Sequence, residues 1–114
     1  MAQAGLDNSL SAFSEKSLKA FRRAKVLIAA ARAAGLDQVE TGVVVDEAAE
    51  VLFRCAGASL LDRTPEERCM ARFAKDIRRV AAAIFALPSW EGDNPLDQLL
   101  LQHADVGALV DGRV

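Results

Sequence analysis

Apolar side chains recur every three or four positions between Thr64 and Pro88, which is the spacing of one face of an α-helix. This face comprises Met70, Phe73, Ile77, Val80, Ile84 and Leu87. Thr64 suits the N-cap position, because its hydroxyl can accept a hydrogen bond from a free backbone N–H of the first turn. Pro65 suits the first helical position, Glu66 and Glu67 suit the positive end of the helix dipole, and Pro88 ends the helix. The pattern therefore predicts a long helix with both ends defined.

A second periodic stretch covers the N-terminal third of the chain. Its apolar positions are Leu10, Phe13, Ala20, Phe21, Ala24, Leu27, Ile28 and Ala31. The opposite side of the same helical wheel carries Lys19, Arg22 and Arg23. Ser9 or Ser11 can cap the start of this helix, and Gly35 offers a left-handed stop after Ala34. We therefore expect a helix from about Ser9 or Ser11 to Ala34.

The next predicted helix, from about Val44 to Leu61, follows a polar connection over residues 35–42. The Val43–Val45 run favours a strand, but the chain offers no comparable second strand to pair with it. The polar sector of the helix is narrow and consists mainly of Glu47, Glu50 and Arg54. A helix that is apolar nearly all round belongs in the middle of a bundle or in an oligomer interface, so a homodimer is expected. Small residues at 56–58 let another backbone approach closely.

A shorter fourth helix is expected near the C-terminal end, where Asn94 and Pro95 repeat the cap-then-proline start. Its apolar face is predicted to comprise Leu96, Leu99, Leu100, Val106 and Leu109. Residues 1–8 are expected to form a flexible segment, and residues 9–112 a single domain. The predicted fold is therefore all-α: a small bundle of three long helices plus a shorter C-terminal helix.

The 114-residue chain has a formal net charge of −2, which by itself indicates no class of partner. Its charges nevertheless fall in blocks. Residues 16–32 are basic, 37–50 acidic, 63–79 mainly basic and 91–111 acidic. Such blocks are typical of neighbouring helices that face each other with opposite charge.

The first residues lack the basic-then-apolar pattern of a signal peptide. No apolar run approaches the roughly 20 residues that span a bilayer. The two cysteines, Cys55 and Cys69, are expected to be free thiols in a reducing compartment. We therefore expect a soluble, cytoplasmic protein without a membrane partner.

The helix predicted between Thr64 and Pro88 carries cations on the side opposite its apolar face. They are Arg68, Arg72, Lys75 and Arg79, and their spacing follows the helical period. Such a row can follow phosphates or bind an acidic protein surface, since guanidinium groups bind either anion in a bidentate manner. The ordinary alternative is a solvated face, neutralised in part by the acidic C-terminal segment. We reject a helix-turn-helix, because the first turn of this helix, which would enter the DNA groove, is acidic.

The chain lacks a recognisable catalytic or metal-binding set. Glu47 and Glu50 share a helix face, but no Glu-x-x-His unit accompanies them, and Glu50 with Arg54 indicates a simple ion pair. His103 is the only histidine, and the two cysteines lack Cys-x-x-Cys spacing. We therefore expect no enzymatic activity, no cofactor and no metal. An enzyme built around Glu47, Glu50, Cys69 or His103 is the remaining alternative.

These observations favour a non-enzymatic protein-interaction module: a small regulator, an adaptor or a subunit of a larger assembly. The residues expected to contact its partner are Arg68, Arg72, Lys75, Arg79, Lys19, Arg22, Arg23 and Trp90. Trp90 either anchors the partner or folds over the end of the bundle. The alternative function is a nucleic-acid-binding accessory protein that uses the same basic side chains. Whether the acidic C-terminal segment covers the basic row decides between these interpretations.

Overall fold

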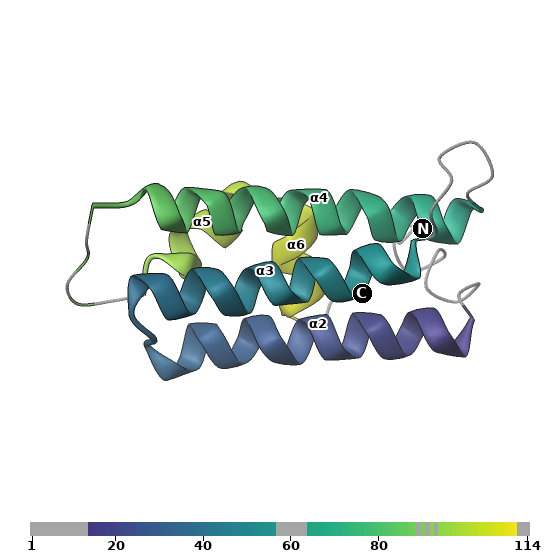
Figure 1. Ribbon diagram of the computed structural model, residues 1–114, viewed down its shortest axis with the longest axis horizontal. Coiled ribbons are helices and arrows are strands. Elements are labelled where there is room, and N and C mark those ends of the chain that lie inside the picture. Colours follow the sequence, from purple (N-terminus) through teal and green to yellow (C-terminus); the bar gives the residue numbers. More distant parts are fainter. Residues whose placement is uncertain (1–13, 57–63, 89, 91, 93, 112–114) are drawn as a thin grey trace.

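The computed structural model describes residues 14–56, 64–88, 90, 92 and 94–111, and every regular element in these ranges is an α-helix (Figure 1). The helices are α2 (Glu15–Ala34), α3 (Gln38–Cys55), α4 (Pro65–Ala86), α5 (Leu96–Gln102) and α6 (Ala104–Val110). The all-α class is confirmed, with three long helices and a shorter C-terminal part. The expected flexible segment 1–8 lies outside the described residues.

α4 forms as its sequence predicts. Thr64 and Glu67 make a capping box, in which the Glu67 N–H donates to the Thr64 hydroxyl at 3.1 Å and the Glu67 carboxylate accepts from the Thr64 N–H at 2.9 Å. The helix ends at Ala86, two residues before Pro88. Its apolar face is buried at Met70, Phe73, Ile77, Val80 and Ile84, with Leu87 half-buried.

α2 begins later than predicted and ends where predicted. Ser14 has an extended backbone (φ −66°, ψ 162°) and its hydroxyl accepts from the Ser17 N–H at 3.2 Å, so Ser14 is the N-cap. The predicted start at Ser9 or Ser11 is therefore wrong, because an extended residue separates those positions, which lie outside the described residues, from α2. Gly35 stops the helix in the left-handed conformation, with φ 62°.

α3 begins six residues earlier than the predicted Val44, so the expected connection over residues 35–42 is wrong. The Asp37 side chain caps the helix by accepting from the Glu40 N–H at 2.9 Å. Gln38 then donates to the Ile84 carbonyl at 3.0 Å, in the last turn of α4, where the Leu87 N–H donates to the same carbonyl at 3.1 Å. The helix ends at Cys55, and the remainder of its predicted length, like most of the small-residue stretch 56–58, lies outside the described residues.

The predicted fourth helix is two helices, α5 and α6, which meet at a break at His103 (φ −123°, ψ 78°). The break changes the direction of the chain, so that α6 packs against α5. A Cβ on Gly107 would lie 3.1 Å from the Leu100 carbonyl oxygen, so a residue without a side chain fits this approach best. Both helices thereby bury apolar positions, namely Leu96, Leu100, Val106, Leu109 and Val110.

α3 lies between α2 and α4 and packs against both, while α5 and α6 lie behind them in the view of Figure 1. Of the two places predicted for this helix, the middle of the bundle agrees with its contacts to both neighbours, while Val39 and Val43 of α3 are exposed. Phe21 of α2 meets Phe73 of α4 edge to face, with ring centroids 5.2 Å apart, inside a core made mostly of alanine and aliphatic side chains. Within the described ranges, no helix combines the length and the apolar character needed to cross a bilayer.

Candidate interaction surface

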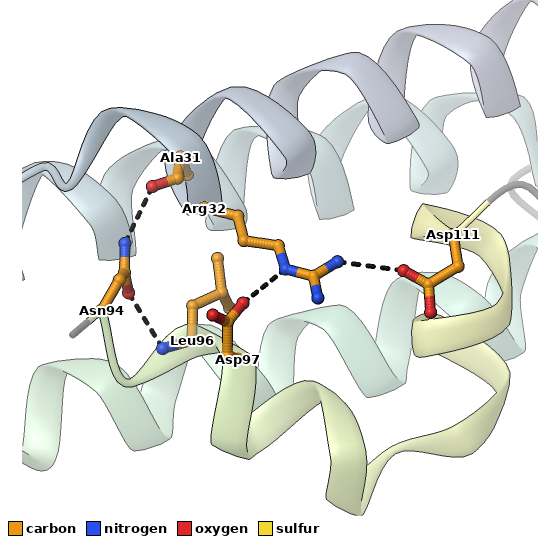
Figure 2. A network of polar contacts seen from close by, with 6 residues as sticks. All are labelled: Ala31, Arg32, Asn94, Leu96, Asp97 and Asp111. Carbon is orange, nitrogen blue, oxygen red and sulfur yellow. Dashed lines mark hydrogen bonds and ion pairs between the residues drawn. The ribbon is translucent and has the colours of Figure 1, made fainter.

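The side of the bundle between α2 and α4 is covered by α5 and α6. Asp97 and Asp111 both bind Arg32 of α2, with Arg32 Nη1 2.9 Å from Asp111 Oδ1 (Figure 2). Beside them, the buried Asn94 donates from Nδ2 to the Ala31 carbonyl at 2.8 Å. These contacts hold α5 and the end of α6 against α2. The described residues therefore leave no open groove between α2 and α4.

Arg78 of α4 bridges α4 and α3. Its Nε lies 3.2 Å from Asp46 Oδ1 and its Nη2 lies 3.3 Å from Glu50 Oε1. The same guanidinium lies over the Phe53 ring, 4.7 Å from the centroid. The predicted Glu50–Arg54 pair is therefore wrong: an exposed pair on one helix is worth little, whereas Arg78 combines two carboxylates with an aromatic face.

Among the described residues, none covers the groove between α2 and α3. We call it the α2–α3 groove, and its volume is about 460 Å³. Its lining residues are Lys16, Lys19, Ala20, Arg23, Glu47, Glu50, Val51, Arg54 and Cys55. Ala20 is buried, and Val51 and Cys55 are half-buried, so the floor is apolar. Arg23 Nη2 lies 3.7 Å from Glu47 Oε2, and this ion pair joins the two helices across the groove.

The cations of the α2–α3 groove exceed the acids that can neutralise them. Glu47 is engaged by Arg23, and Glu50 by Arg78. Lys16, Lys19 and Arg54 make no ion pair with any residue that the structure describes. An adjoining hollow of about 440 Å³ shares the two lysines and adds Glu15 and Arg22. The positive surface therefore extends from the last turns of α3 over the first turns of α2.

The predicted basic row on α4 is partly neutralised. Arg72, whose side chain is 57% exposed, has Nε 3.9 Å from Asp105 Oδ2 of α6, and Arg79 Nη1 lies 3.6 Å from Asp76 Oδ1 on its own helix. Arg68 and Lys75 are exposed. The acidic C-terminal segment thus reaches the row at Arg72, while Asp97 of α5 and Asp111, which follows α6, bind Arg32 on α2.

The basic residues predicted on α2 and those on α4 do not form one continuous face. Lys19 and Arg23 line the α2–α3 groove, and Arg22 lies beside it. Between them and α4 runs α3, whose Asp46, Glu47 and Glu50 face the neighbouring helices with negative charge. The prediction that charge blocks on adjacent helices face each other is confirmed here. Trp90 is half-buried and packs against the core.

The candidate chemical groups are not gathered into one site. Cys69 is buried in α4, where burial raises the pKa of its thiol and the neighbouring Arg72 lowers it only in part. Glu47 and Glu50 belong to ion pairs of α3, and His103 stands at the break between α5 and α6. In the described ranges no three His, Cys, Asp or Glu side chains are grouped so as to hold a metal ion.

Sequence reasoning missed Lys16 and Arg54 as members of the positive surface and Arg78 and Arg32 as bridging residues. The basic block 16–32 contained the signal for Lys16, and the narrow polar sector of the second predicted helix contained Arg54. Nothing in the local sequence marks Arg32, because Asp111, one of its partners, lies 79 residues further along the chain.

No protein-family model, curated protein or solved structure matches this chain. The function is therefore inferred from the geometry and charge of its surface.

Proposed function

We propose that this chain is a non-enzymatic protein-interaction module, acting as a small regulator, adaptor or subunit that binds an acidic surface of another protein. The observation that carries the proposal is the α2–α3 groove, which combines an apolar floor with cations that have no described acid to pair with. Protein surfaces that bind partners combine such apolar area with a polar rim. A solvated face, by contrast, needs no apolar floor.

A protein partner fits this surface better than a nucleic acid does. The residues described as lining it include no aromatic side chain on which a base could stack. The acids of α3 also separate the cations of α2 from the row on α4, which shortens any continuous path for a phosphate backbone.

We also propose that the protein acts in the cytoplasm. Cys55 and Cys69 are both free thiols, which supports a reducing environment such as the cytoplasm.

The homodimer stays a prediction. The apolar surface that would carry it lies at the other end of α3, where Val39 is 63% and Val43 53% exposed. Phe85 of α4 lies beside them, since its ring covers Gly42. Light scattering of the purified chain measures the mass in solution and decides between monomer and dimer.

Purification of the tagged chain from its own cells, with and without nuclease, tests the proposed function. We expect a protein that co-purifies in stoichiometric amount and is retained after nuclease treatment. Loss of every co-purifying protein on nuclease treatment, or the absence of any stoichiometric protein, would contradict the proposal. The first of these results would favour the nucleic-acid alternative, because phosphate contacts would then hold the complex together.

A further inference from the structure

We infer that the α2–α3 groove binds an acidic amphipathic helix supplied by a partner protein. This inference rests on the proposed function and specifies the site and the partner's chemistry. Of the three sides of the α2, α3 and α4 bundle, one is covered by α5 and α6 and one is bridged by Arg78. The side between α2 and α3 forms a groove that no described residue covers.

The shape of the groove suits a helix. α2 and α3 are consecutive long helices joined by a short turn, and a further helix packs along such a pair as in a four-helix bundle. Ala20 and Cys55 are small, so side chains from a docked helix can reach the floor beside Val51. An apolar stripe laid into a groove is a common mode of helix recognition, with anchors three or four residues apart.

The charges specify what must flank that apolar stripe. Lys16 and Lys19 stand one helical turn apart on the α2 rim, and Arg54 stands on the α3 rim. None of the three is paired with a described acid. A partner helix with carboxylates on both sides of its apolar stripe therefore meets a cation at each rim. The Arg23–Glu47 ion pair crosses the groove and limits how far the helix extends toward the α2–α3 turn.

A designed peptide probes the site on the full chain. The peptide has about 20 residues, enough to form a helix, with leucines at helical spacing flanked by glutamates and a fluorescent label at one end. Two further peptides replace its glutamates by lysines or its leucines by serines, and a single-stranded oligonucleotide serves as the nucleic-acid probe. Anisotropy reports binding, and the rate of Cys55 alkylation reports whether the groove is occupied, since Cys55 lines it.

We expect the leucine–glutamate peptide to bind most tightly and to slow alkylation of Cys55. Lys19→Glu should weaken its binding about fivefold, because an attraction is replaced by a repulsion. Lys25→Glu makes the same exchange at a lysine of α2 that does not line the groove and should leave the affinity unchanged, which makes it the matched control.

Three results would overturn the inference: equal loss in both variants, no protection of Cys55, or tighter binding of the oligonucleotide. Failure of the inference is distinguishable from failure of the proposed function. If a nuclease-resistant partner co-purifies from cells but the peptide does not protect Cys55, the groove is not the binding site. The proposed function as an interaction module is then still supported. If no partner co-purifies, the proposed function itself fails.

Discussion

At the scale of single residues, Glu66 has a role that its sequence position only partly predicts. It was expected to favour the helix dipole from the first turn of α4, and it also reaches α2. Its carboxylate accepts from the Ser14 hydroxyl at 2.9 Å, from the Ser14 N–H at 3.2 Å and from the Ser17 hydroxyl. Burial alone would raise the pKa of Glu66, but the hydrogen bonds from Ser17 and Ser14 outweigh it and lower the pKa below the ordinary value of a glutamate.

This lowered pKa predicts a pH dependence of stability. Because the folded state favours the ionised form, Glu66 contributes stability that is present above the ordinary pKa of a glutamate and is lost as the pH falls through the lower pKa of the folded state. Urea unfolding measures the free energy of unfolding of the wild type and of Glu66→Gln at a series of acidic pH values. This free energy should depend less steeply on pH in the variant than in the wild type. Glu40→Gln, at an exposed position of α3, is the control. Identical pH profiles for Glu66→Gln and the wild type would contradict the account.

At the scale of helices, local pattern predicted α4 almost completely, the end of α2 correctly, and the starts of α2 and α3 poorly. The capping box of α4 lies within four residues, so the sequence contains all of it. Ser9, Ser11 and Ser14 are equally good caps by residue type, and the choice of Ser14 goes with its contacts to Glu66, 52 residues away. The α3 start likewise involves Gln38 and the carbonyls that end α4. The spacing of apolar residues along one segment cannot predict partners that lie so far away in the sequence.

Gly42 gives a prediction for the contact between α3 and α4. A Cβ at this position would lie 2.7 Å from two ring atoms of Phe85, whereas alanine is otherwise favoured over glycine within a helix by about 1 kcal/mol. In a Phe85→Ala background we expect Gly42→Ala to stabilise the fold by roughly that amount. In the wild type the ring must move, and the gain should shrink or reverse. Urea unfolding of the four chains measures the difference, and an equal gain in both backgrounds would show that Phe85 does not restrict this position.

At the scale of the whole molecule, the sequence predicted which blocks of charge exist but not which cations remain without a partner. Opposite charges on neighbouring helices do meet, at Arg23 with Glu47 and at Arg78 with Asp46. The acidic C-terminal segment, however, spends two of its carboxylates on Arg32. Arg72 and Arg79 of the α4 row each lie within 4.0 Å of a carboxylate, whereas Lys16, Lys19 and Arg54 at the α2–α3 groove pair with no described acid. Only the tertiary arrangement shows which cations are paired.

The most direct test of the central claim compares two double charge reversals in the tagged chain, with nuclease present throughout. Lys19→Glu with Arg54→Glu changes the α2–α3 groove, and Arg72→Glu with Lys75→Glu changes the row on α4; circular dichroism verifies that both variants are helical. Measured by the amount of stoichiometric protein that co-purifies, the groove variant should lose its partner and the α4 variant should retain it. Retention by the groove variant, with loss by the α4 variant, would contradict the account and return the binding surface to α4.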